Sequence, residues 1–230
     1  MLANFLVPIN DDGWRFVGIF AAVTFVAALT GLAWLFWPLL LLTLWCVYFF
    51  RDPPRVVPQD DNVLVAPADG LVSMIVPAVP PAELGLGDQK LTRVSIFLSV
   101  FDVHINRVPC AGRIDVVAYR PGLFLNAAAD KASEDNERMA IAMVRADGTR
   151  IGFVQIAGWV ARRIICWIKP GQAVAVGERC GHIRFGSRTD LYLPAGARLL
   201  VGVGQRMIGG ETVMAELGAA TGEPRATLEF

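Results

Sequence analysis

The feature that most constrains this chain is a run of 35 residues, from Phe16 to Phe50, that contains no charged side chain. As one α-helix the run would extend about 52 Å, whereas the hydrocarbon core of a bilayer is roughly 30 Å thick. Either a single helix crosses the membrane at a steep tilt, or two shorter helices, broken near Thr30-Gly31 or at Pro38, form a hairpin. A cleaved signal peptide fits poorly, because the run is too long and its start lacks basic residues.

Basic residues flank this apolar run, since Arg15 precedes it and Arg51 and Arg55 follow it. Positively charged flanks favour the cytoplasmic side of a membrane. We therefore expect residues 1–50 to be a membrane-associated helical segment at the cell (inner) membrane, with the body on the cytoplasmic side. Residues 51–61, RDPPRVVPQDD, contain three prolines and predict a stiff linker. Residues 62–230 are numerous enough for one catalytic domain with its own core.

Charge and cysteine content exclude some classes of function. The chain has 21 basic and 21 acidic residues, so its formal net charge is zero and we expect no nucleic-acid partner. Cys46 lies in the apolar run, and Cys110, Cys166 and Cys180 have no C-x-x-C spacing. We expect free, buried thiols and no metal site.

Residues 62–230 predict a mainly β domain, so the whole chain is a β-rich α+β protein with an N-terminal helical segment. Short β-branched and apolar runs alternate with turn residues: NVLVAP, GLVSMIVP, TRVSIFLSV, GRIDVVAY, ERMAIAMVRA, TRIGFVQIAG and RRIICWI. Asp147-Gly148, between two of these runs, predicts a hairpin turn. After Lys169, glycines separate short apolar triplets, a rhythm that resembles the barrel-sandwich hybrid of biotinyl and lipoyl domains. Only residues 127–133 suggest a helix in this part of the chain.

Few residues are available for acid-base chemistry, because the chain has only two histidines, His104 and His182. His104 follows an apolar strand and stands among polar residues. Asp69, in PADG, is either a turn aspartate or the carboxylate that orients a catalytic histidine.

The stretch RFGSRTD places Gly186 directly before Ser187. A glycine carbonyl is open to attack, and a serine hydroxyl becomes a nucleophile when a base takes its proton. With His104 as that base, Oγ can attack the Gly186 carbonyl and convert the peptide to an ester. Elimination and hydrolysis then leave a pyruvoyl group at residue 187. A Gly-Ser pair alone is too common to predict this chemistry.

Six segments together, in one order along the chain, resemble the short form of the phosphatidylserine decarboxylase family: FFRDPPR, PADG, FLSVFDVHINRVP, KASEDNER, QIAGWVARRIICW and RFGSRTDLYLP. The likeness extends from about Phe49 to Met214. It implies a proenzyme that cuts itself between residues 186 and 187 into a β chain, 1–186, and an α chain, 187–230. Ser187 would become the covalent pyruvoyl cofactor.

The resemblance also implies that Asp69, His104 and Ser187 act together in self-cleavage. Longer family members carry two histidines in this region. Aligned on Pro109, this chain has His104 at the first position and Arg107 at the second. His104 therefore serves both self-cleavage and decarboxylation, or another group takes one of these roles.

The implied reaction converts phosphatidylserine to phosphatidylethanolamine and CO2 in phospholipid biosynthesis, with His104 as the proton donor to the product. The expected partners are a phospholipid, the membrane and the paired α and β chains, and a higher homo-oligomer is left open. Leu123, Phe124 and Leu125 either dip into lipid or cap the core. Three basic residues either attract anionic lipid or form a solvated face: Arg162, Arg163 and Lys169.

Two other functions stay open from the sequence. A related serine phospholipid with ether-linked, archaetidylserine-like chains has the same head group and would undergo the same reaction. A non-enzymatic, membrane-tethered adaptor or carrier would also suit the glycine rhythm. In that case DKA, at residues 130–132, resembles a lipoyl-lysine turn.

Overall fold

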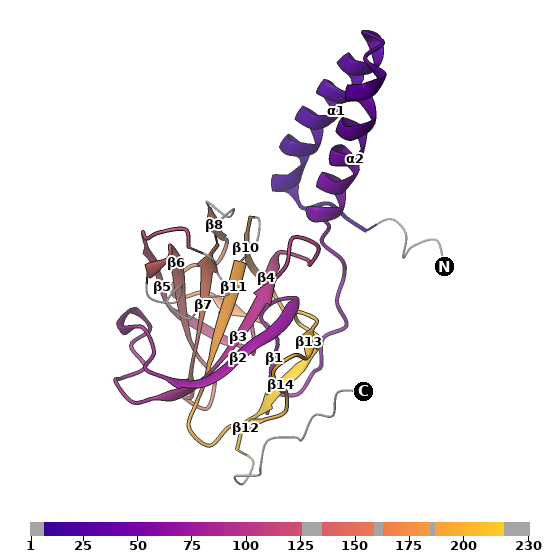
Figure 1. Ribbon diagram of the computed structural model, residues 1–230. Helices are drawn as coiled ribbons and strands as arrows, with labels where there is room; N and C mark the ends of the chain where they lie inside the picture. Colours follow the sequence, from indigo (N-terminus) through magenta and orange to yellow (C-terminus); the bar gives the residue numbers. More distant parts are fainter. Residues whose placement is uncertain (1–6, 126–134, 159–162, 185–186, 219–230) are drawn as a thin grey trace. The chain divides into compact units, whose positions relative to one another are not determined.

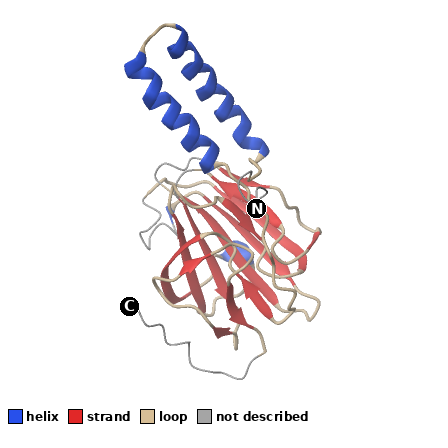
Figure 2. Cartoon of the chain, turned by 90° about the vertical axis from the view of Figure 1, so that its right-hand side faces the viewer, coloured by secondary structure: helices blue, strands red, loops and turns tan. Residues whose placement is uncertain are grey.

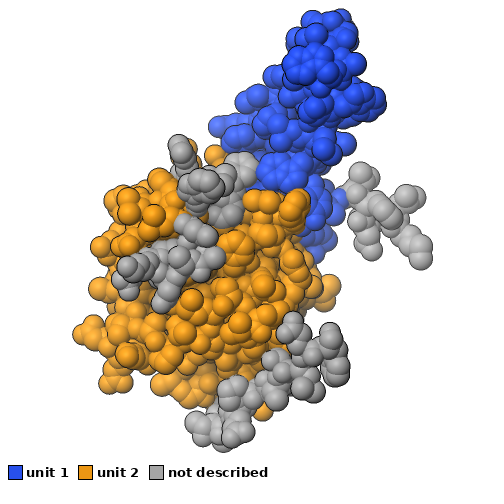
Figure 3. All heavy atoms as spheres, in the orientation of Figure 1, with its two compact units in different colours: residues 1–54 blue, residues 55–230 orange. Residues whose placement is uncertain are grey.

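The computed structural model describes residues 7–125, 135–158, 163–184 and 187–218. The chain divides into two compact units, Met1–Pro54 and Arg55–Phe230, which Figure 3 draws in different colours. The first unit is helical and the second is built from strands. The expected helix at residues 127–133 and the DKA stretch lie outside the described residues.

The apolar run forms two helices that contact each other. A short 3-10 turn, η2 (Asp11–Gly13), leads into α1 (Trp14–Leu29), and α2 (Ala33–Phe49) follows after three residues. Gly31 has a φ of 70°, a left-handed conformation that a glycine adopts without strain. The helix therefore breaks at Thr30-Gly31, and Pro38 lies inside α2.

The outer surface of this hairpin is apolar. The stretch Asp11–Leu29 is 19 residues long and apolar enough to cross a membrane, with only 17% of its most apolar window buried. The two helices contact each other through Thr24 and Thr43, whose hydroxyl oxygens are 3.0 Å apart. Large apolar side chains point outward, among them Ile19, Phe25, Leu29, Trp34, Trp37 and Leu41. Such a surface favours association with lipid.

The two ends of the hairpin are held together at its base. The Asn10 amide donates to the Phe50 carbonyl at 2.8 Å, and the Asp52 amide donates to the Pro8 carbonyl at 2.7 Å. A Cβ on Gly13 would lie 2.5 Å from the Phe50 Cβ, so only glycine permits this approach. The chain thus enters and leaves the helix pair at one end.

The second unit contains three antiparallel sheets (Figures 1 and 2). The large sheet has eight strands in the order β13-β2-β3-β11-β7-β6-β5-β9 and curls on itself. The small sheets have the orders β4-β10-β8 and β1-β14-β12. The strands are β1 (Val63–Val65), β2 (Gly70–Ala78), β3 (Leu91–Leu98), β4 (Ile105–Arg107), β5 (Gly112–Arg120), β6 (Arg138–Val144), β7 (Arg150–Ala157), β8 (Ile164–Cys166), β9 (Ala173–Val174), β10 (Arg179–Ile183), β11 (Ser187–Leu193), β12 (Arg198–Leu199), β13 (Arg206–Met207) and β14 (Val213–Glu216). The mainly β prediction is confirmed.

The main hydrophobic core lies between the inner face of the large sheet and the two small sheets. Its members come from both sides of this interface, for example Ile96 and Phe153 from the large sheet and Cys180 and Met214 from the small sheets. A second cluster covers the outer face, where Leu84 of the 3-10 turn η3 (Ala82–Leu84) packs with residues of β6, β7 and β11. The large sheet is therefore covered on both faces, and its central strand β11 is buried along its whole length.

The β6–β7 connection forms the hairpin that Asp147-Gly148 predicts. Gly148 has a φ of 82°, and its amide donates to the Arg145 carbonyl at 3.0 Å. The strands then pair in register from Val144 opposite Arg150 to Arg138 opposite Ile156. This hairpin lies at the end of the sheet away from Ser187, because Ser187 pairs with Ala157 at the other end of β7.

Candidate active site

Ser187 is the first residue of the central strand β11. It pairs with Leu98, the last residue of β3, and with Ala157, the last residue of β7. Its side chain has no solvent exposure, and its Oγ has no hydrogen-bond partner within the described parts of the chain. Gly186, the other half of the predicted cleavage site, lies outside the described residues. A buried hydroxyl without a partner is costly, which suits a group kept for chemistry.

Strand alternation sets the direction of the Ser187 side chain. Leu191 and Leu193 belong to the inner core, whereas Tyr192 belongs to the outer cluster. Because side chains alternate along a strand, Ser187 and Thr189 share the inner face with these leucines. The serine therefore points into the space between the large sheet and the small sheets.

On the outer face of the same strand, Arg188 and Asp190 form an ion pair. Arg188 Nε and Asp190 Oδ1 are 2.9 Å apart, and both side chains are only 1% exposed. Arg93 Nε of β3 lies 3.8 Å from the other carboxylate oxygen of Asp190. The charges in RFGSRTD thus stabilise the back of the strand, while its hydroxyl groups face inward.

His104 is buried, at 3% exposure, just before β4. Its Nδ1 is 3.0 Å from the main-chain carbonyl oxygen of Asp102. A carbonyl only accepts hydrogen bonds, so this contact assigns the proton to Nδ1 and leaves the lone pair on Nε2. The His104 carbonyl in turn accepts the amide of Ile183 at 3.4 Å, three residues before Gly186. A neutral imidazole in this tautomer can act as a general base.

The loop that carries His104 is fixed by Asp102. Oδ2 of Asp102 accepts hydrogen bonds from the amide and the hydroxyl of Ser99, both at 2.8 Å. Oδ1 accepts from Arg206 at 2.6 Å. Because Ser99 directly follows Leu98, the strand residue opposite Ser187, this loop begins beside the predicted nucleophile.

Asp69 contacts an arginine and a backbone amide. Arg55 Nη2 lies 2.9 Å and 2.8 Å from its two carboxylate oxygens, and the Gly209 amide donates to Oδ1 at 2.8 Å. Burial raises the pKa of Asp69 above its usual range, an effect that the nearby Arg55 charge and the Gly209 hydrogen bond oppose. The carboxylate is thus bound by groups that fix its position.

The three predicted residues approach one end of the large sheet along neighbouring strands. Asp69 immediately precedes β2, Ser187 begins β11, and His104 lies in the segment after β3, the strand between them. Gly70 permits the close packing of β2 on β3, because a Cβ there would lie 2.2 Å from the Phe97 carbonyl oxygen. The hydrogen bonds of Asp69 nevertheless go to Arg55 and Gly209 rather than to His104.

Asn136 is a polar residue of this region that the sequence did not single out. Its side-chain amide binds both the amide and the carbonyl of Leu125, at 3.0 Å and 2.9 Å, and the carbonyl of Ala157 at 2.7 Å. Asn136 therefore attaches the loop at residues 123–125 to the strand end beside Ser187. In that loop Phe124 packs against the small cluster of Ala157, Ile164 and Ile183, whereas Leu123 and Leu125 are 57% and 41% exposed.

The other groups singled out in the sequence lie on neighbouring elements, as His182 does opposite Ile105, or elsewhere in the chain. His182 of β10 is buried, with its ring 5.5 Å from that of Trp167. Arg163 and Lys169 are exposed, and Arg162 lies outside the described residues. Cys110 and Cys180 are buried free thiols, and Cys166 is half-buried.

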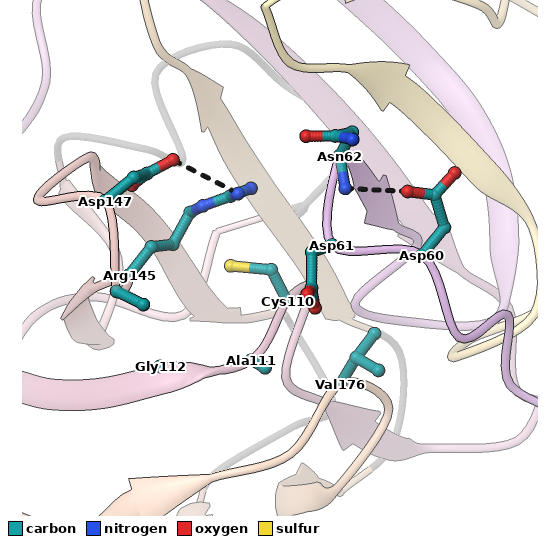
Figure 4. A pocket seen from close by; sticks show the side chains of 10 residues that line it. Asp60, Asp61, Asn62, Cys110, Ala111, Gly112, Arg145, Asp147 and Val176 are labelled. Carbon is teal, nitrogen blue, oxygen red and sulfur yellow. Dashed lines mark hydrogen bonds and ion pairs between the residues drawn. The ribbon is translucent and has the colours of Figure 1, made fainter.

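A cavity of about 360 Å3 lies near the β6–β7 hairpin, at the other end of the sheet from Ser187. Figure 4 shows Arg145 and Asp147 on one side of it and Asp60 and Asn62 on the other, with Cys110 between them. Burial raises the pKa of Cys110 to about 12. This cavity is separate from the serine, so we do not assign the candidate chemistry to it.

Comparison with known proteins shows which family this chain resembles. Residues 42–215 match the family model described as phosphatidylserine decarboxylase. The chain is 57% identical over 219 residues to a phosphatidylserine decarboxylase proenzyme of Cereibacter sphaeroides, which covers 94% of this chain and 93% of that protein. It is 56% identical over 217 residues to the proenzyme of the same name from Ruegeria pomeroyi, covering 94% and 99%.

Proposed function

Because this chain belongs to the phosphatidylserine decarboxylase family, we propose that it is a self-cleaving proenzyme that converts phosphatidylserine to phosphatidylethanolamine and CO2. The observation that carries the proposal is the position of Ser187. Its hydroxyl is buried without a partner among the described residues, directly after Gly186 in sequence. The relatives' names support both the lipid substrate and the precursor form.

Self-cleavage would begin when His104 Nε2 accepts the Ser187 hydroxyl proton and Oγ bonds the Gly186 carbonyl carbon. The C–N bond between the two residues then breaks, which gives an ester and a free amine on residue 187. Loss of the residue-187 Cα proton and of the Gly186 carboxylate follows. Hydrolysis of the resulting enamine releases ammonia and leaves a ketone. The β chain would be residues 1–186 and the α chain residues 187–230.

The residues around Ser187 fit a pyruvoyl group. The small side chain of Ala157 lies opposite, and the inward direction of residue 187 leads into the protected space between sheets. Once formed, the group supplies a ketone that accepts the lipid amine and an electron sink for the charge left when CO2 departs. The chain's own part is to exclude water and to deliver a proton to the former carboxylate-bearing carbon, for which His104 is the proposed donor.

Asp69 would assist through its fixed position and its negative charge. Its carboxylate is held by Arg55 and Gly209, and it lies close enough to Asp102, whose main-chain carbonyl contacts His104, for the Asp102 charge to raise the Asp69 pKa. We propose that Asp69 stabilises the cationic form of His104 through this arrangement, an electrostatic role that needs no direct hydrogen bond.

The helical hairpin would hold the enzyme at the membrane where its substrate resides. A hairpin that enters and leaves at one end keeps Arg15 and Arg51 on the same side of the bilayer. Basic flanks favour the cytoplasmic face, so we place the strand unit in the cytoplasm at the inner membrane. Tethering reduces the search for a two-chain lipid to the surface of one leaflet.

Intact-mass measurement of the purified protein tests the proposal. The wild type should give two fragments that separate between residues 186 and 187, with the α fragment carrying a carbonyl that borohydride reduces. Ser187→Ala should stay one uncut chain without decarboxylase activity. A single full-length mass for the wild type, with no reducible carbonyl, would refute the self-cleaving mechanism.

A further inference from the structure

Three polar side chains near Ser187 lie between the large sheet and the small sheet that contains β4. Thr189 follows it on β11 and pairs with Gln155 of β7. Gln155 Nε2 donates to Oδ1 of Asn106 on β4 at 2.7 Å, a hydrogen bond that joins the large sheet to a small one. All three side chains have zero exposure, so these polar groups lie within a core that is otherwise mainly apolar.

This group has unused hydrogen-bonding capacity. Asn106 Nδ2, Gln155 Oε1 and Thr189 Oγ1 have no partner within the part of the chain that the structure describes. If the side-chain amides of Asn106 and Gln155 were both flipped, Asn106 would donate and Gln155 would accept. In either orientation one N–H donor and one carbonyl acceptor of the pair are left over. An unsatisfied buried polar group costs roughly 1–3 kcal/mol. A cluster of them beside a reactive residue is therefore better explained by a ligand than by stability.

The position suits a ligand bound at residue 187. Gln155 is the diagonal neighbour of Ser187, because Ser187 pairs with Ala157 and Thr189 pairs with Gln155. Diagonal neighbours on one sheet face are about 7–8 Å apart, within reach of a long side chain. Ser187 is fully buried in the intact chain, so a ligand would reach the group after the peptide bond is cut.

The chemistry of the pair matches an α-amino acid head group. A serine head group carries a primary amine, which donates hydrogen bonds, and a carboxylate, which accepts them. An amide pair with one donor and one acceptor can bind both without a full charge. Neutral donors also stabilise a carboxylate less than an arginine would, which leaves CO2 loss less hindered.

We propose that Asn106 and Gln155, supported by Thr189, form the subsite that positions the amine and carboxylate of the serine head group. This inference rests on the proposed function and specifies how its substrate is recognised. The donor amide contacts the carboxylate only before decarboxylation, so the pair favours substrate over the ethanolamine product.

The test compares two soluble amines that differ only by the carboxylate, O-phosphoserine and O-phosphoethanolamine. Each is incubated with full-length protein in detergent and cyanoborohydride, and all α-chain adducts are counted by mass, including any that have lost CO2. In Asn106→Leu/Gln155→Met, phosphoserine adducts should fall at least tenfold at limiting concentration because both contacts are lost. Phosphoethanolamine adducts lose only the contact to the amine and should fall less than threefold. Self-cleavage should persist, because Ser187 and His104 are untouched.

Ser95→Ala is the matched control, since Ser95 Oγ is also buried without a partner in the described chain but faces Asp190 on the outer side. It should leave both adduct yields unchanged. The milder Asn106→Ser replaces the double variant if that variant fails to fold. Equal losses for both amines, or no loss for either, would overturn the head-group assignment alone. A wild type that forms no adduct would overturn the proposed function together with it.

Discussion

Arg55 Nη2 contacts both carboxylate oxygens of Asp69, at 2.9 Å and 2.8 Å. The two side chains are 11% and 16% exposed, so solvent screens the pair only in part. Arg55 belongs to the proline-rich linker and Asp69 to the turn before β2. The immediate partner of the predicted orienting carboxylate is therefore an arginine from the linker, and the contact ties this linker to the strand unit.

Replacing this arginine should destabilise the fold and slow maturation. In Arg55→Ala the Asp69 carboxylate loses its arginine partner and keeps the hydrogen bond from the Gly209 amide, and we expect a loss of about 2 kcal/mol of unfolding free energy. Urea unfolding of the otherwise uncleaved Ser187→Ala protein measures the loss, and the rate of fragment formation in the Ser187 background measures maturation. Asp69→Asn combined with Arg55→Ala should cost less than the sum of the single changes. Strict additivity would show that the pair is not coupled.

Substitutions in the loop at residues 123–125 should distinguish a role in lipid contact from a role in stability. Leu123→Asp with Leu125→Asp replaces exposed side chains, so we expect decarboxylation of vesicle lipid to fall several-fold while the urea midpoint and self-cleavage stay unchanged. Phe124→Ala removes a ring packed against the cluster of Ala157, Ile164 and Ile183 and should instead lower stability by about 2 kcal/mol, less than the loss for a fully buried phenylalanine. If the aspartate variant is as active on vesicles as the wild type, the exposed leucines have no role at the membrane.

Alkaline pH should destabilise the fold through the buried thiol of Cys110. Burial raises its pKa from 9.0 to about 12, so the unfolded chain loses this proton at a lower pH than the folded chain. The contribution to stability is complete below pH 9 and is lost as the pH rises toward 12. Between these values the slope approaches about 1.4 kcal/mol per pH unit.

Urea unfolding of Ser187→Ala and Ser187→Ala/Cys110→Ala from pH 8 to pH 11 tests this point. Above pH 9 the unfolding free energy should fall more steeply in the protein that keeps Cys110. The packing lost in Cys110→Ala adds a constant difference and does not change the slope. Tyr192, whose pKa burial also raises to about 12, is present in both proteins and cancels in the difference. Parallel curves would contradict the assigned burial of the thiol.

Removing the helical hairpin should affect location more than folding. Among the described residues, none from 7–54 belongs to the hydrophobic clusters of the strand unit, so a chain that begins at Arg55 should keep a cooperative urea transition. It should fail to sediment with anionic phospholipid vesicles, whereas the full chain does so. A truncated chain that still binds vesicles as tightly would assign membrane attachment to the strand unit.

Much of the fold follows from local signals in the sequence. Bilayer thickness limits the length of the apolar run, a left-handed backbone favours glycine at position 31, and the twist of a hairpin favours the Asp147-Gly148 turn. The seven apolar runs predicted as strands correspond to β1, β2, β3, β5, β6, β7 and β8. The sheet order could not be predicted, because β11 pairs with β3 between residues as far apart in sequence as Thr92 and Leu193, a separation of 101 positions.

The site was predictable only in its individual residues. Gly186-Ser187, His104 and the PADG turn can be recognised in the sequence. The Asp69–Arg55 contact cannot, because it depends on how the linker packs against the strand unit. Asn106 and Gln155 lie 49 positions apart, and each alone reads as a polar residue in or near an apolar strand. Gln155 within IGFVQIAG was the available signal, since an amide in a fully buried strand needs a partner. The partner comes from another sheet, which periodicity along one strand does not indicate.

Scission before Ser187 would place the new chain end at the middle of the large sheet. The residues after that bond form β11, β12, β13 and β14. β11 lies between β3 and β7 in the large sheet, and β14 pairs with β1 in a small sheet. The shorter fragment is therefore interwoven with the longer one through two sheets. Its dissociation would require global unfolding, so the severed protein should behave in solution as one inseparable particle.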